Sequence, residues 1–244
     1  VVINLPKLKT HRKTGMTCAL KNLVGINGNK DWLPHHRKGA AADGGDEYLK
    51  RSIRKHIASS LADAMEQPIS GSAKKILFAL RRLIISSKRI FPFPDPYMEG
   101  SWWGNDTIPR TVADLNRILL YADSEGNIHE KSCRKILHIV DAVICGEGEG
   151  PIEPDAKECG LIMGCSNAAA LDAACAAVMG FDPDKIPVIR HAFSTNSFPI
   201  AGFNPGEVMI SFDNKLIDPK SGLTSELSHR FNPSSGWRGH IEKS

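Results

Sequence analysis

Short apolar runs alternate with segments of helical periodicity, and this pattern constrains the fold more than any other feature of the chain. Four runs are rich in β-branched residues and bounded by Gly, Pro or Asp, which predicts strands. They occupy residues 1–5, 135–145, 160–165 and 207–212. Four further segments have the apolar spacing of helices. They occupy residues 47–66, 72–88, 111–122 and 167–179. Because the two types alternate between residues 136 and 180, we expect an α/β fold: a layered domain with a mixed, partly parallel sheet flanked by helices.

The chain has 244 residues, which is enough for one large domain. It begins without methionine and inside a predicted strand, so we expect residues 1–244 to form a single α/β domain that is a fragment of a longer chain, with its N-terminal part missing. Residues 28–125 are expected to form an inserted helical and loop region. A targeting signal would be lost with the missing part, so a cytoplasmic location is the default expectation only.

Bulk composition excludes several classes of protein. The net charge of +4 gives little support to nucleic-acid binding, and no apolar run is long enough to cross a bilayer. The six cysteines include no CxxC pair, so the sequence encodes neither a zinc knuckle nor a cysteine-ligated iron–sulfur cluster. We interpret these cysteines as buried, reduced thiols.

Residues 72–89 form a basic amphipathic segment. Its apolar residues recur at helical spacing between lysines and arginines, which predicts a helix with a cationic outer face. One interpretation is a helix that faces solvent or a partner, and that partner could be a second copy of the chain in a homo-oligomer. Contact with an anionic membrane surface is the other.

The densest group of polar side chains, here called the basic segment, occupies residues 9–22. It combines lysines, a histidine, hydroxyl groups and a glycine, and apolar runs flank it on both sides. Lysines and free backbone N–H groups at the start of a helix would hold a phosphate or a carboxylate, and an imidazole moves protons near neutral pH. We predict an anion-binding turn in which His11 is a general acid/base, with a basic surface turn as the alternative. The predicted binding residues are Asn4, Lys9, Thr14, Thr17, Lys21 and Asn22.

A second group, here called the acidic segment, occupies residues 141–151. Asp141 is followed by glycines that alternate with Glu147 and Glu149, which predicts a flexible glycine-rich loop after a strand. The segment is no Walker loop, because no Gly-Lys-Ser/Thr follows, and its carboxylates would repel the pyrophosphate of a dinucleotide. The carboxylates could instead face a cation, a basic partner group or the lysines of the basic segment. A solvated turn is the alternative.

Two smaller groups complete the set of candidate binding residues. Asp172 lies among small apolar residues of a predicted helix, so an inward-facing carboxylate there needs a partner. Either a ligand site or backbone N–H groups could supply it. Asn105, Asp106 and Arg110 follow a pair of tryptophans and could line a ligand pocket, or cap a helix.

Metal binding rests on weaker patterns. The adjacent His35 and His36 on a long loop could chelate a metal ion, and Glu147 and Glu149 offer the oxygen atoms that hard divalent cations prefer. The sequence therefore allows a divalent metal but identifies no cofactor.

The chain resembles domain-of-unknown-function family 362, and the matching residues recur in order over nearly its whole length. They are residues 2–11, 14–17, 19–25, 104–107, Arg110, 114–116, 140–141, 146–148, 150–151, 172–173, 179–180 and 236–242. The family is uncharacterised biochemically, so the resemblance implies a family rather than a reaction. Members often carry ferredoxin-type cysteine motifs or twin-arginine export signals, and this chain shows neither.

A shorter stretch is similar to the N-terminal region of the nickel-pincer lactate racemase family. A strand there is followed by Lys-x-His, a Thr/Gly turn and a lysine. The resemblance implies that His11 would serve as the acid/base and that Lys21 would carry the cofactor. It makes His11 and Lys21 the candidate catalytic pair.

Two functions remain open from the sequence. The first is an enzyme that binds a small anionic substrate or cofactor where the basic segment faces the acidic segment across one crevice. The second is a non-catalytic cofactor-binding or electron-transfer accessory protein.

Overall fold

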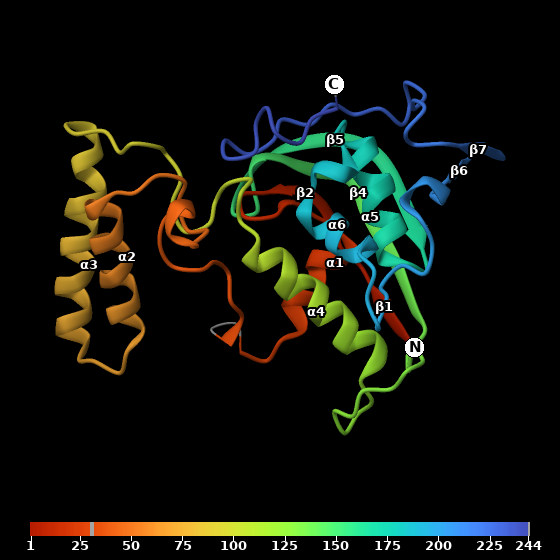
Figure 1. The fold of residues 1–244 in the computed structure, drawn as a ribbon. Coiled ribbons are helices and arrows are strands. Elements are labelled where there is room, and N and C mark those ends of the chain that lie inside the picture. Colours follow the sequence, from red (N-terminus) through yellow and green to blue (C-terminus); the bar gives the residue numbers. More distant parts are fainter. Residues whose placement is uncertain (30–31, 244) are drawn as a thin grey trace.

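A mixed sheet forms the centre of the computed structural model, which describes residues 1–29 and 32–243 (Figure 1). Its strands are β1 (Val2–Asn4), β2 (Lys7–His11), β3 (Gly15–Thr17), β4 (Ile136–Glu149) and β5 (Glu153–Cys165). The long strand β4 pairs in parallel with β1 through its first residues and with β2 further along, and β5 runs antiparallel on it. β3 pairs antiparallel with β2. The expected α/β fold with a partly parallel sheet is confirmed.

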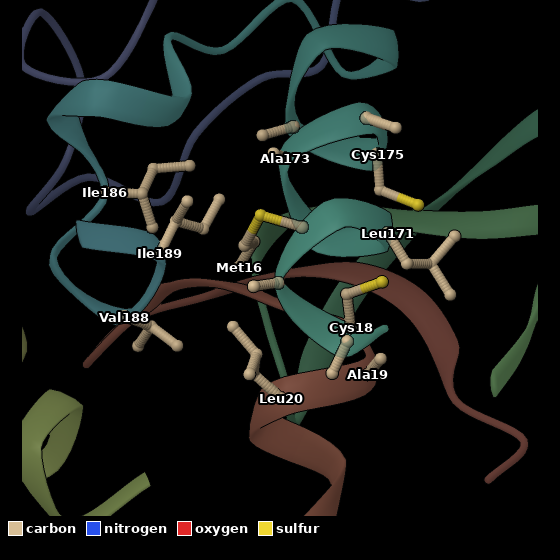
Figure 2. Close-up of a cluster of buried hydrophobic side chains, with 14 of the residues drawn as sticks. Met16, Cys18, Ala19, Leu20, Leu171, Ala173, Cys175, Ile186, Val188 and Ile189 are labelled. Carbon is tan, nitrogen blue, oxygen red and sulfur yellow. The ribbon is translucent and has the colours of Figure 1, made fainter. Parts of the chain in front are cut away.

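Helices α1 (Ala19–Asn22), α4 (Thr107–Tyr121), α5 (Ala168–Val178) and α6 (Pro187–Phe193) pack around the sheet and one another. Figure 2 shows side chains of residues 16–20 meeting those of α5 and of residues 186–189 in the main apolar cluster. α5 is almost wholly buried because its alanines allow close packing. As the sequence predicts, the side chain of Asn167 caps α5 by accepting the N–H groups of Ala169 and Ala170. Gly180, at a φ of 78°, lies just beyond its end.

Helices α2 (Ile53–Glu66) and α3 (Gly71–Ser86) form an antiparallel hairpin that stands apart from the sheet (Figure 1). A buried ion pair anchors this hairpin: Lys55 Nζ lies 2.6 Å from the carboxylate of Asp95. α2 begins later than the expected residue 47, because Ser52 caps it and the preceding residues form turns. In the described ranges, no helix combines the length and the hydropathy that crossing a bilayer requires.

Two other expectations about local structure are wrong. The acidic segment is not a flexible loop, because β4 continues through it to Glu149 and pairs with β5 throughout. The basic segment begins as a β-hairpin, β2–β3, rather than as a turn that follows the first strand. Its charged residues can lie in a strand because β4 supplies the hydrogen-bonding partner from more than 130 residues away.

The C-terminal region begins with a two-stranded sheet of β6 (Ile210–Phe212) and β7 (Lys215–Ile217). The expected strand at residues 207–212 starts late, because Asn204 and Glu207 close a short helical turn through a capping box. From there the chain runs back across the top of the molecule (Figure 1). This return brings Trp237 against the β2–β3 hairpin.

Candidate functional site

The tip of the β2–β3 hairpin is fixed by a tryptophan from the other end of the chain. Gly15, paired with His11, has a φ of 81°, and a Cβ atom there would lie 3.2 Å from the ring of Trp237. Trp237 is fully buried, and its Nε1–H donates to the carbonyl of Arg12 at 2.7 Å. The conformation that presents Lys9, His11 and Lys13 is therefore imposed by tertiary packing.

His11 is buried in a cationic environment. Burial, together with the nearby charges of Lys21, Lys13 and Lys9 and a smaller effect of His35, lowers the pKa of His11 to about 2. The backbone N–H of Lys13 donates to Nδ1 of His11 at 3.0 Å. This hydrogen bond assigns the proton of the neutral ring to Nε2. The imidazole is thus a neutral donor at physiological pH.

Lys21 is carried by α1, a helix of four residues whose backbone is held by buried polar side chains. The carboxylate of Asp172 accepts the N–H groups of Ala19 at 2.8 Å and Leu20 at 3.3 Å. In return, Asn4 donates to the carbonyl of Ala19 and Asn116 to that of Leu20, at 2.9 and 3.0 Å. From the sequence, Asp172 could either contact a ligand or accept backbone N–H groups. In the structure its carboxylate accepts the backbone N–H groups of α1.

Burial raises the pKa of Asp172 to about 7, although hydrogen bonds from Cys18 and from the backbone of α1 act in the opposite direction. The same burial raises the pKa of the neighbouring Cys18 thiol. Asp172 is therefore a support of α1 whose own charge depends on pH near neutrality.

Asn4 and Asn22 are joined in the same support. Asn22 Nδ2 donates to Asn4 Oδ1 at 2.7 Å, and Asn4 Nδ2 lies 2.9 Å from Nδ1 of His138. Burial lowers the pKa of His138 to about 4, which keeps it neutral and able to accept this bond. The two asparagines thus link β1, β4 and α1, and any contact they make with a ligand stays a prediction.

The two predicted threonines differ in their hydrogen bonding. Thr14 Oγ1 donates to the carbonyl of Met16 at 2.9 Å, which closes the hairpin turn. Thr17 Oγ1 is buried, and it has no hydrogen-bond partner in the part of the chain that the structure describes. Thr17 is paired with Lys9 across the hairpin. A buried unsatisfied hydroxyl beside a lysine is a group that a polar ligand could satisfy.

The acidic segment lies directly beside β2, but its glutamates point to the C-terminal region. Glu147 accepts the backbone N–H and the side-chain amide of Asn232, both at 2.9 Å, and lies 3.2 Å from Lys157 Nζ. Burial alone would raise the pKa of Glu147, but these contacts outweigh it and lower the pKa. Glu149 accepts the N–H of Ser235 at 2.6 Å.

The glycines of the acidic segment permit the close approach of β4 to β2. A Cβ atom at Gly150 would lie 2.1 Å from the carbonyl oxygen of Thr10, and one at Gly146 would lie 3.1 Å from the Cβ of Lys9. Thr10 Oγ1 also donates to the carbonyl of Gly148. The alternation of glycine in this segment is thus explained by backbone packing.

Asp141 lies earlier on β4, on an exposed part of the sheet. Its carboxylate is 2.6 Å from Lys7 Nζ, and this hydrogen bond, with one from the N–H of Val143, lowers the pKa of Asp141. The ion pair runs between neighbouring strands and is open to solvent. A ligand role for Asp141 stays a prediction.

The candidates at the start of α4 are engaged in local contacts. Asn105 Oδ1 accepts the N–H groups of Thr107 and Ile108, and its Nδ2 donates to the carbonyl of His35 at 2.9 Å. Burial opposes ionisation of Asp106, but hydrogen bonds from Arg110 and His191 outweigh it and lower the pKa of Asp106. Asn105 therefore ties the α4 terminus to the loop that carries His35.

A polar cavity of about 520 Å³ opens between the α2–α3 hairpin and the tip of the β2–β3 hairpin. Lys13, His35 and His36 line part of this cavity. Burial lowers the pKa of each of these three side chains. His36 Nδ1 is buried and lacks a partner among the described residues. The remaining polar lining residues are Glu47, Ser59, Asp63, Glu66, Arg81 and Glu99.

Sequence reasoning missed most of this lining. For Lys13, its place in the basic segment was a signal from which the sequence could have predicted a site residue. Glu47, Arg81 and Glu99 lie far apart in the sequence and share no motif. Arg81 pairs with Glu99 across the cavity wall. Only the docking of α2 and α3 onto the loops at residues 33–47 and 98–99 assembles this pocket.

The candidate metal ligands are divided between two places. His35 and His36 line the polar cavity, whereas Glu147 and Glu149 bond to the C-terminal region. Within residues 1–29 and 32–243, no group of three or more His, Cys, Asp or Glu side chains is arranged to hold a metal ion. Metal binding by these residues stays a prediction.

Comparison with known proteins places residues 1–177 in a single family, described as Domain of unknown function (DUF362). No curated protein and no solved structure matches the chain. The resemblance to the lactate racemase family is therefore not confirmed. The matched residues include the basic segment, the acidic segment and Asp172, whereas Trp237 lies beyond them. Because the match covers well over half of the chain, the protein belongs to the DUF362 family.

Proposed function

We propose that the protein is an enzyme that binds a small carboxylate- or phosphate-bearing molecule beside His11. The observation that carries this proposal is the burial of His11 among Lys9, Lys13 and Lys21, whose charges repel its protonated form. Positive charges around a buried imidazole disfavour its protonated form, and a bound anion offsets that repulsion. Perturbed titratable groups of this kind are concentrated at functional sites.

The polar cavity provides a route to this cluster. Lys13 and His35 line the cavity, and both are close enough to His11 to lower its pKa. The buried hydroxyl of Thr17 offers one further donor beside Lys9. Lys13 is the lysine that lines the cavity, so an anion that reaches His11 from the cavity would meet its ammonium group, whereas Glu47, Asp63, Glu66 and Glu99 lie elsewhere on the lining.

His11 would act through its Nε2–H. Because Nδ1 accepts the N–H of Lys13, Nε2 is the atom that carries the proton and can donate it to a ligand oxygen. A bound anion offsets the repulsion from the lysines, so its arrival raises the pKa of His11 toward the ordinary value for histidine. His11 would thus become able to gain and release a proton only when the site is filled.

Thermal denaturation with added anions tests the binding site. We expect inorganic phosphate, malonate or acetate at constant ionic strength to raise the unfolding temperature of the wild type by linkage. Lys21→Gln should require at least tenfold more anion for the same effect, whereas Lys131→Gln, which replaces an exposed lysine before the start of β4, should not change it. An equal response in both variants would remove Lys21 from the site.

Nuclear magnetic resonance of the His11 ring tests the proton-transfer role. Without ligand, His11 should stay neutral with its proton on Nε2 down to pH 4. With saturating anion, its pKa should rise by more than one unit. A ligand that binds but leaves the His11 pKa unchanged would favour the alternative, a non-catalytic binding protein that uses the same lysines.

A further inference from the structure

Helix α3 exposes an apolar stripe that no described part of the chain covers. None of its residues is buried, and the exposed fractions are 61% for Ile76, 46% for Leu80 and 69% for Leu83. These residues recur at spacings of three and four, with Ala79 between them, so they form one continuous line along the helix. Phe78 is 57% exposed but lies two residues from Ile76 and from Leu80, which places it on another side of the helix.

The charges that α3 and its flanking residues carry all have one sign. Residues 67–94 contain six basic side chains and no acidic one. Lys75 and Arg82 are exposed and lie seven residues apart on α3, which places them in a basic row along one edge of the stripe, and the exposed Arg89 follows beyond the end of the helix. A partner for this face must therefore combine an apolar interior with a negatively charged surface.

The opposite side of α3 belongs to the rest of the molecule. Arg81 pairs with Glu99 at the wall of the polar cavity, and Leu83 lies two residues further, almost half a turn around the helix. Figure 1 shows α3 at the outer edge of the molecule, with α2 between it and the sheet. The stripe can thus be covered without closing the cavity.

We propose that α3 docks the protein onto an anionic lipid surface. A helix with leucine and isoleucine on one face and only basic charges on the rest of its surface is typical of helices that lie in the membrane interface. A second copy of the chain is a poorer partner, because a twofold interface pairs this patch with itself, and residues 67–94 supply six basic side chains and no acidic one. The basic row instead complements the headgroups of phosphatidylserine.

Co-sedimentation with vesicles tests the proposal. The full chain should pellet with vesicles of 30% phosphatidylserine in phosphatidylcholine at low salt, and much less with pure phosphatidylcholine or at high salt. Each basic residue near such a surface contributes about fivefold in affinity, so Lys75→Glu with Arg82→Glu should weaken binding by at least about 30-fold. Ile76→Ser with Leu83→Ser should weaken it by a similar factor, because the buried apolar area is lost.

Matched controls carry the same chemical changes on other exposed positions. Lys131→Glu with Lys215→Glu reverses two exposed lysines, and Ile152→Ser with Leu216→Ser removes two side chains that are 74% and 72% exposed. Both controls should bind vesicles as the wild type does. Circular dichroism should show the wild-type helix content in all four variants.

Three results would overturn the proposal. The first is the absence of pelleting with phosphatidylserine at low salt, and the second is equal loss of binding in the α3 variants and the controls. The third is a dimer in light scattering that dissociates in Ile76→Ser with Leu83→Ser, since the stripe would then be covered by a second copy.

Discussion

The basic and acidic segments run side by side in the sheet, yet they use their charged side chains in opposite ways. Glu147 and Glu149 accept hydrogen bonds from the C-terminal region, and the contacts of Glu147 lower its pKa, so its negative charge stabilises the fold. The lysines around His11 instead repel its protonated form. The two glutamates are therefore part of the scaffold, whereas a cluster of like charges around a buried imidazole is typical of functional sites.

The same contrast appears in what holds each segment in place. The acidic segment is a strand paired along its length with β5. The basic segment depends on distant buried groups: Trp237 at the hairpin tip and Asp172, Asn4 and Asn116 around α1.

The largest expected effect comes from Trp237→Ala. Trp237 is fully buried against Gly15 and bonded to Arg12, so its truncation should lower the free energy of unfolding by about 3–5 kcal/mol. Urea denaturation measures this loss. Trp32, which is 81% exposed, is the control, and Trp32→Ala should change the free energy by less than about 0.5 kcal/mol. Similar losses in both variants would contradict the role of Trp237 in fixing the hairpin.

The next effect is a dependence of stability on pH through Asp172. Its pKa is about 7 in the folded protein and near its ordinary value of 3.8 in the unfolded chain. The folded state therefore binds more protons between these values, and its stability falls as pH rises through them. We expect a decrease on the order of 3 kcal/mol between pH 4 and pH 8 from this group.

Asp172→Asn removes the titrating group and serves as the comparison. Urea denaturation across the same pH range should show a flatter stability curve for this variant than for the wild type. Parallel curves for the two proteins would show that Asp172 keeps its charge in the folded state. The interpretation of Asp172 as a titrating support of α1 would then be wrong.

The smallest effect should come from Glu147→Gln. This change keeps an acceptor for Asn232 but removes the charge facing Lys157, so it should cost about 1 kcal/mol of stability. Phosphate should still raise the unfolding temperature of this variant, with an anion affinity within twofold of the wild type. A large change in affinity would break the comparison, because the acidic segment would then belong to the ligand site.

Short-range patterns predicted much of the fold. The apolar runs that became β1, β4 and β5, and the helix α5 with its Asn167 cap, follow from residues close together in sequence. These elements are defined by propensity, spacing and capping, which a linear sequence displays directly. The density of lysine, histidine and threonine in residues 9–22 identified the candidate site in the same way.

The β2–β3 hairpin and the polar cavity could not be predicted from such patterns. β2 is a strand because β4 pairs with it, and the cavity exists because two helices dock onto distant loops. The strand conformation of the acidic segment could not be predicted either. β4 continues beyond its apolar residues because β5 pairs with it as far as Glu149.

The sequence by itself determined the α/β class, the principal strands and helices, the family and the position of a dense basic segment. The tertiary structure alone decided which groups surround each charge. It placed Asp172 on the backbone of α1, 153 residues away, Glu147 on Asn232 and the lysines around His11. The physical reason is that propensity acts between neighbours in the chain, whereas burial, pKa and hydrogen-bond satisfaction depend on neighbours in space.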